Sequence, residues 1–148
     1  MSDRFDLQRF VDAQDQGRTH EAALAELRAG RKTGHWMWFV FPQIAGLGRS
    51  TTAQEFAISS LDEARAYLRH PVLGPRLADS ARVLTEAAGR SAEQIFGGLD
   101  AQKLRSSMTL FLRADPGDPQ ASPFAQVLSQ YFDGQPDPAT DRLLGPGS

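Results

Sequence analysis

Apolar residues recur at intervals of three and four along almost the whole chain, and no segment alternates convincingly between apolar and polar residues. The first spacing places side chains on one face of an α-helix, whereas alternation is typical of a half-buried strand. The pattern therefore predicts an all-α fold. A chain of 148 residues fits one domain. We expect a compact single domain of about six or seven helices over residues 5–144, with flexible termini at 1–4 and 145–148.

Helix boundaries are indicated by capping residues and glycines. The spacing of Leu7 and Phe10 predicts a first helix that ends at Gly17, and a second helix is expected from Thr19 to Gly30. Further helix starts are predicted where a side chain can accept from the first backbone N–H groups. These positions are Ser60-x-x-Glu63, Ser91-x-x-Gln94, Asp100 and Ser122-Pro123.

The densest aromatic stretch runs from position 36 to 41 and contains both tryptophans. A run this short fits a buried strand or a buried helical turn equally well. Because no second strand is available to pair with it, we expect a short helix or an irregular segment at the centre of the core. Large aromatic side chains dominate core burial, so at least one of Trp36 and Trp38 should be buried against the helix at 104–112 or at 124–132.

Composition excludes several classes of protein. Without cysteine, disulfides and iron–sulfur clusters are excluded, and His20, His35 and His70 are not spaced as metal ligands, so we expect no metal and no cofactor. A net charge of −2, spread evenly, gives no attraction to duplex nucleic acid or anionic membranes. The longest apolar run is far below the roughly 20 residues of a membrane span. The N-terminus lacks a signal-peptide core, which favours the cytoplasm. Nothing in the sequence indicates an oligomeric state.

Polar residues flank the aromatic stretch in a pattern typical of a small-molecule pocket. Lys32, His35 and Gln43 lie at its ends, and a glycine loop follows. The loop lacks the full dinucleotide and Walker fingerprints. It can still form an anion-binding nest if Ser50 starts a helix. The candidate ligand-binding residues are Lys32, Trp36, Trp38, Gln43, Gly46, Gly48, Ser50, Arg76 and Lys103, and the candidate acid–base residues are His35, Glu63 and Asp100.

Each of these residues also has a purely structural interpretation. The tryptophans can be core residues, and His35 can be a hydrogen-bonded structural histidine. Glu63 can be the third residue of its capping box. Asp100 and Lys103 can form a helix cap and a surface ion pair worth a few tenths of a kcal/mol.

Several strings of residues together resemble a known bacterial family. They are His35-Trp36-Met37-Trp38-Phe39-x-Phe41-Pro42-Gln43, Gly46-Leu47-Gly48-x-Ser50, Glu63-Ala64-x-Ala66-Tyr67-Leu68-x-His70-Pro71-x-Leu73-Gly74-x-Arg76-Leu77, Ile95-Phe96-Gly97 and Lys103-Leu104-x-Ser106-Ser107-Met108-Thr109-Leu110-Phe111. The chain resembles the domain-of-unknown-function family eighteen-ten over about residues 5–144.

The resemblance implies a mainly α-helical single domain and brings no assigned reaction. Some members carry a calpastatin-like label, which does not suit this chain because calpastatin-type inhibitors are disordered and repetitive. The family pattern usually has tyrosine at position 20 and a hydroxyl-bearing aromatic at 56, where this chain has His20 and Phe56. The layout is also similar to small helical N-glycosidases that act on ADP-ribose-like and riboflavin-precursor compounds, an analogy at the level of fold.

Two functions remain open after these exclusions. The first is a pocket for a small anionic, nucleotide- or ADP-ribose-like ligand, with hydrolysis of an N-glycosidic bond if the protein is an enzyme. Here we expect Lys32 and Arg76 to face a common cleft with His35. The second is a non-catalytic protein–protein interaction module, which an exposed face of Trp36, Trp38 and Phe41 would favour.

Overall fold

The computed structural model describes residues 4–87 and 89–145. Most of the expected flexible terminal residues, 1–3 and 146–148, lie outside this range. Within it there are ten α-helical segments and two 3₁₀ turns, η1 (Gln16–Arg18) and η2 (Pro119–Ala121). The α-helices are α1 (Gln8–Asp15), α2 (Thr19–Ala29), α3 (Met37–Val40), α4 (Thr51–Glu55), α5 (Leu61–Arg69), α6 (Leu73–Glu86), α7 (Ala92–Phe96), α8 (Gly98–Ala114), α9 (Pro123–Phe132) and α10 (Pro138–Leu144).

The prediction of an all-α domain is confirmed. Seven of these helices have seven residues or more, whereas α3, α4 and α7 have only four or five. The only β-type pairing among the described residues is a bridge between Ile44 and Ile58. It ties the loop after the aromatic stretch to the start of the α5 region.

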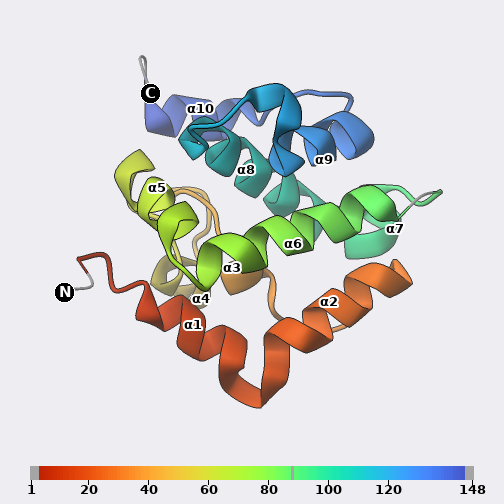
Figure 1. Ribbon diagram of the computed structural model, residues 1–148, viewed down its shortest axis with the longest axis horizontal. Coiled ribbons are helices and arrows are strands. Elements are labelled where there is room, and N and C mark those ends of the chain that lie inside the picture. The colour runs from red at the N-terminus through yellow and green to blue at the C-terminus, as the bar shows by residue number, and fades with distance from the viewer. Residues whose placement is uncertain (1–3, 88, 146–148) are drawn as a thin grey trace.

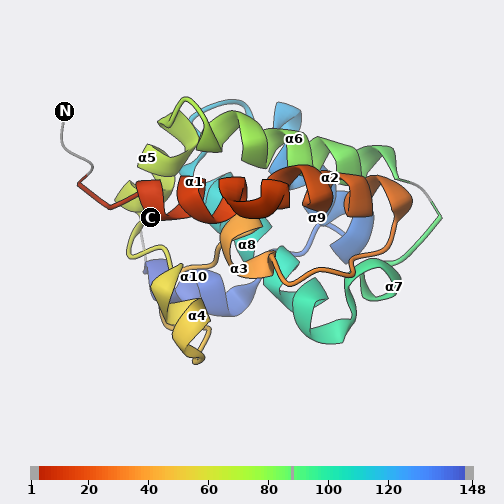
Figure 2. The same cartoon turned by 90° about the horizontal axis from the view of Figure 1, so that it is seen from below.

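Helix α8 lies at the centre of the fold and packs against α5, α7, α9 and α10 (Figure 1). Every residue from Ser106 to Phe111 is buried, so α8 is covered on all sides rather than on one face. Helix α6 packs against α9 on one side and α2 on the other. Seen from below, α1 and α2 run one after the other along the outside of α6 (Figure 2).

The capping predictions hold at most helix starts. Ser91 and Gln94 form the complete capping box, and Ser122 caps α9 as expected. Ser60 accepts from the Glu63 N–H, but the Glu63 carboxylate accepts from Ser59 instead of returning to Ser60. Only half of the predicted box therefore forms.

The prediction that Asp100 caps a helix is wrong. Helix α8 begins three residues earlier than expected, and its N-cap is Gly97 at a φ of 80°. A backbone at this φ favours glycine, which has no β-carbon to clash. Asp100 therefore lies inside the first turn of α8, where its carboxylate is free to contact another part of the chain.

The aromatic stretch forms a buried short helix, as predicted. Trp36 is only 1% exposed, and Phe41 is fully buried. The indole of Trp36 contacts the rings of Phe41 and Phe96, with centroids 6.3 and 6.5 Å away. The aromatic partners of Trp36 thus come from its own segment and from α7, while Phe124 of α9 pairs with Phe111.

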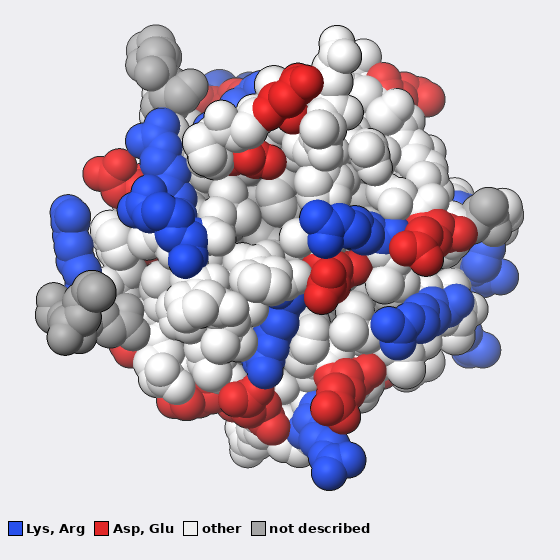
Figure 3. Space-filling view, viewed as in Figure 1, with Lys and Arg blue, Asp and Glu red and all other residues white. Residues whose placement is uncertain are grey.

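Basic and acidic side chains are interspersed over the face shown in Figure 3, and neither sign forms a continuous surface there. This agrees with the net charge of −2. Among the described helices, none is both long enough and apolar enough to cross a membrane.

His20 on α2 makes the stability of the fold dependent on pH. Burial lowers the pKa of His20 from its ordinary 6.5, and the positive charge of Arg76 lowers it further, against weaker opposing effects of Asp79, Asp15 and Glu21. Its Nδ1 is buried without a hydrogen-bond partner in the described structure. The unfolded chain therefore binds a proton on this side chain more readily than the folded chain does.

We expect the free energy of unfolding to fall as the pH drops below the unfolded pKa of His20, about 6.5. In the His20→Phe variant, the decrease in the free energy of unfolding that comes from His20 should be absent. Urea unfolding of both proteins between about pH 5 and pH 8, the range in which histidine titrates, measures the difference. Parallel pH profiles for parent and variant would contradict the expectation, since His35 and His70 are common to both.

Candidate functional site

Lys32 and Lys103, the only lysines of the chain, meet at one carboxylate. Lys32 Nζ lies 2.8 Å from Asp100 Oδ2, and Lys103 Nζ lies 3.2 Å from Asp100 Oδ1. We call these three residues the two-lysine cluster. Lys32 comes from the loop after α2, whereas Asp100 and Lys103 lie in the first two turns of α8. The cluster thus joins two distant parts of the sequence.

Lys32 is the buried member of the cluster. Its side chain is 9% exposed, and Nζ also donates to the Gly34 carbonyl at 2.6 Å. The ammonium lies 5.2 Å from the centroid of the Trp36 ring, which attracts a cation to its face. The backbone N–H of Lys32 donates to the carbonyl of Ile95. Lys32 is therefore held in place on several sides, and its main effect is to fix the position of Asp100.

Glu26 of α2 holds the loop that carries Lys32. Its Oε1 accepts from the N–H groups of Thr33 and Gly34 at 2.7 and 2.8 Å and from the Trp36 indole at 3.0 Å. Burial raises the pKa of Glu26, but the donors from Gly34, Thr33 and Trp36 outweigh this effect and lower it overall. Sequence reasoning missed Glu26. The only signal was the need of a buried indole N–H for an acceptor.

Asp100 and Lys103 are the accessible members of the cluster, with side chains 21% and 29% exposed. Burial raises the pKa of Asp100, but the hydrogen bonds and charges of Lys32 and Lys103 lower it below its ordinary value. Lys103 Nζ also lies 5.3 Å from the centroid of the half-buried Trp38 ring. The site thus presents an ionised carboxylate, an ammonium group and an aromatic face together.

The three groups differ in the chemistry that each can bind. A carboxylate accepts hydrogen bonds from hydroxyl groups, an ammonium donates to phosphate oxygens, and an indole offers a surface for a planar ring. His35 is exposed on the loop that Lys32 anchors. Next to Asp100 in the chain, the side chain of Leu99 is 85% exposed.

Glu63 lies in a different part of the fold from the cluster. Its Oε2 pairs with Arg9 at 2.9 Å, and its Oε1 accepts from the Ser59 N–H and hydroxyl at 2.9 and 2.7 Å. Its side chain is only 3% exposed. The structure therefore gives Glu63 a structural position, and no hydrogen bond or ion pair joins it to Asp100 or His35 among the described residues.

Lys32 and Arg76, which were expected to face a common cleft, are bound by different partners. Arg76 binds Gln14 and Asp15 of α1, at 3.2 and 2.8 Å, while Lys32 is held by Asp100. Arg76 thereby fastens α6 to α1.

The glycine loop is likewise engaged within its own segment. Ser50 does start a helix, as the nest hypothesis required, but its Oγ accepts from Ala53 N–H and α4 has only five residues. A β-carbon at Gly48 would lie 2.4 Å from that of Ala53, and one at Gly46 would lie 3.2 Å from Leu143. The Gln43 carbonyl accepts from Ile58. These residues pack the loop against its neighbours, and the contacts described here do not involve the two-lysine cluster.

Two further features bear on binding. No group of three or more His, Asp or Glu side chains suited to a metal ion occurs among the residues that the structure describes.

A cavity of about 450 Å³ lies at the other end of α8, between α5, α6 and α9. Arg113, which lines this cavity, is 13 residues after Asp100 on α8. At a rise of 1.5 Å per residue, the cavity is therefore about 20 Å along the helix from the two-lysine cluster. Its lining comes from positions 65 to 124, so no local pattern indicated it.

The fold and the site together define a small, single-domain helical protein with a lysine–carboxylate cluster beside its aromatic core. The chain belongs to the family described as "Protein of unknown function (DUF1810)", whose model matches residues 4–144. No curated protein matches. A solved structure, the conserved hypothetical protein Rv1873 from Mycobacterium tuberculosis, is 51% identical with a TM-score of 0.90, and the match covers 96% of this chain and 98% of that one.

Proposed function

We propose that this protein binds a small anionic, nucleotide- or ADP-ribose-like molecule at the two-lysine cluster. The observation that carries the proposal is the convergence of both lysines on Asp100, in a chain whose other 14 basic residues are arginines. Lysine is a compact point charge, whereas arginine is a planar fork. A site that uses both lysines and places each over a tryptophan ring is more specialised than an ordinary surface ion pair.

Binding would use the accessible half of the cluster. In this proposal Lys103 turns from Trp38 toward a phosphate, Trp38 receives the planar ring, and Asp100 accepts from sugar hydroxyls. Lys32 keeps the carboxylate ionised and in place. Because Lys32 already has its own partners, we assign the ligand's phosphate to Lys103.

The same geometry suits hydrolysis of an N-glycosidic bond. The bond between the anomeric carbon and the nitrogen breaks, and water supplies the hydroxyl to the carbon and, overall, a proton to the nitrogen. The ionised Asp100 would stabilise the positive charge that develops on the sugar. His35, exposed on the anchored loop, is the titratable group available to protonate the leaving nitrogen. Glu63 has no part in this proposal because Arg9 and Ser59 occupy it.

A thermal-shift screen with ADP-ribose, nucleotides and sugar phosphates tests the proposal. A ligand at 100 times its Kd adds about 2.7 kcal/mol of stability, a shift of several degrees for a domain of this size. For any compound that binds, Lys103→Met should weaken affinity about tenfold, because a hydrogen bond to a charged group is worth about 1.5–3 kcal/mol. This variant leaves the Lys32–Asp100 pair in place.

Arg142→Met, which removes an exposed cation from α10, is the matched control and should bind like the parent. Release of free base and reducing sugar from the same compounds measures hydrolysis, which Asp100→Asn should abolish. If no compound binds, or if Lys103→Met binds as well as the parent, the site is not a nucleotide-type pocket. If a compound binds but is not hydrolysed, the proposed ligand site is supported and the proposed hydrolase activity is contradicted.

The exposed Leu99 favours a second candidate, a protein–protein interaction module. A large apolar side chain that is 85% exposed beside charged groups resembles the centre of a small contact surface. Of the three aromatic residues expected on such a surface, Trp36 and Phe41 are buried and Trp38 is half-buried. Sedimentation of the parent and of Leu99→Ser distinguishes the candidates, since only an interaction surface centred on Leu99 would lose self-association in the variant.

A further inference from the structure

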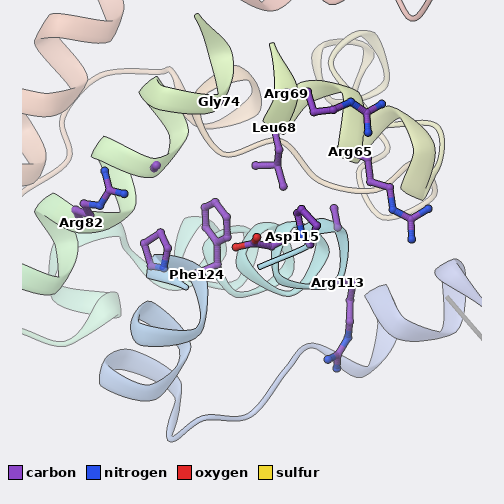
Figure 4. A pocket seen from close by; sticks show the side chains of 12 residues that line it. Arg65, Leu68, Arg69, Gly74, Arg82, Arg113, Asp115 and Phe124 are labelled. Carbon is purple, nitrogen blue, oxygen red and sulfur yellow. The ribbon is translucent and has the colours of Figure 1, made fainter. Parts of the chain in front are cut away.

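The cavity of about 450 Å³ at the far end of α8 has an apolar interior. Leu68 from α5, Ala78 from α6 and Phe124 from α9 line it. Phe124 is 2% exposed, and its ring packs on Phe111 of α8 with centroids 6.0 Å apart. In Figure 4, Leu68 and Phe124 point into the space between their helices. The floor of the cavity is therefore part of the rigid core.

The corner between α5 and α6 forms one wall of this space. A β-carbon at Gly74 would lie 2.1 Å from the carbonyl oxygen of Leu68, so only glycine allows the first turn of α6 to come this close to α5. Both Leu68 and Gly74 line the cavity. The start of α9, fixed by its Ser122 cap, closes the opposite side.

Four arginines surround this apolar interior, with Asp115 as the one carboxylate in the lining. Figure 4 shows Arg65, Arg69, Arg82 and Arg113 around the edge. Arg113 is held by two hydrogen bonds to Asp141, both of 3.0 Å. Of the other three, Arg65 and Arg69 come from α5, and Arg82 comes from α6 on the other side of the cavity.

These three arginines are available to a ligand. The ion pairs of Arg65 with Asp62 and of Arg82 with Asp79 are both 3.4 Å long and exposed, and such pairs contribute little. For Arg69 the described structure shows no hydrogen bond or ion pair with a side chain. A guanidinium group binds a carboxylate or phosphate through two parallel hydrogen bonds. Asp115 is already engaged with the Gly117 N–H at 2.9 Å.

We propose that this cavity is a second binding site, for a small molecule with a flat apolar body and one carboxylate or phosphate group. The body lies between Leu68 and Phe124, and Arg69 and Arg82 turn inward to bind the anion. The volume is within the range of roughly 300–1,000 Å³ typical of small-molecule sites. The site is separate from the two-lysine cluster and does not depend on the function proposed for it.

Isothermal titration with matched probes tests this site. We expect 1-naphthyl phosphate to bind more tightly than either inorganic phosphate or 1-naphthol, because only the first offers both the anion and the flat body. Comparison with 1-naphthoate shows whether phosphate or carboxylate is preferred. Arg69→Gln combined with Arg82→Gln should weaken binding of naphthyl phosphate at least tenfold, which corresponds to about 1.4 kcal/mol.

Two further variants make the result specific to the cavity. Ala78→Leu adds volume inside it and should also abolish binding, while keeping a good helix former on α6. Arg28→Gln removes an exposed charge from α2, outside the cavity lining, and should bind as the parent does. If inorganic phosphate binds as well as naphthyl phosphate, or if Ala78→Leu leaves the affinity unchanged, the proposal is overturned.

Discussion

Replacing Trp36 by alanine is expected to lower the free energy of unfolding by about 3–5 kcal/mol, as typical of a large buried aromatic side chain. Trp36 is 1% exposed and packs against Phe41 and Phe96. The substitution also removes the indole N–H that donates to Glu26 at 3.0 Å. The loss therefore combines an unfilled core volume with a weakened hold on the loop that carries Lys32.

Chemical denaturation of the parent and two variants measures this effect. Trp38→Ala is the matched control because Trp38 is the chain's other tryptophan and only half-buried, so its loss should be clearly smaller. Trp36→Phe keeps most of the ring and should lie between the parent and Trp36→Ala. Unfolding curves for Trp36→Ala and the parent that coincide would show that this residue is not part of the core.

Replacing Arg9 by methionine is expected to cost a similar amount, about 3–5 kcal/mol, because it leaves a buried carboxylate without its counter-ion. Glu63 is 3% exposed and pairs with Arg9 at 2.9 Å. The guanidinium also donates to the carbonyls of Phe5, Asp6, Glu55 and Ala57. One side chain thus ties the start of α1 to the segment that leads into α5.

A double-mutant cycle separates the ion pair from the other hydrogen bonds. Glu63→Gln keeps the shape of the side chain and removes its charge. If the charge pair dominates, the double variant should be less destabilised than the sum of the two single variants. Strict additivity of the two losses would contradict a direct Arg9–Glu63 interaction. An Arg9→Met protein as stable as the parent would show that the buried carboxylate does not need its partner.

The candidate site shows where local patterns were sufficient and where they were not. Lys32, Asp100 and Lys103 were all singled out from the sequence, but for different roles, with Asp100 expected to cap its helix. Once Gly97 takes the N-cap position, Asp100 is released to meet Lys32. This earlier helix start therefore adds Lys32 to the Asp100–Lys103 ion pair that the sequence had already suggested.

Two other candidate residues are held by charged partners that the sequence did not indicate. Arg76 and Glu63 are charged residues beside the core, as expected, but each is bound by an opposite charge from α1, by Asp15 and Arg9 respectively. The sequence could not reveal this, because helix α1 carries few apolar residues and its packing partners follow only from the overall fold. The arginine-lined cavity was missed because its lining comes from separate helices, α5, α6, α8 and α9, which only the overall fold brings together.

By itself the sequence determined the all-α class, the main helices and most of their ends, because helical periodicity, capping side chains and glycines act within a few residues of each other. It also indicated that the aromatic stretch is buried, because burial follows from apolar surface alone. Only the tertiary structure decided which charges meet and where cavities remain. Ion pairs such as Lys32–Asp100 and the cavity between α5, α6 and α9 depend on distances between segments that are far apart in the chain. Those distances are set by the packing of whole helices, which no local pattern of residues specifies.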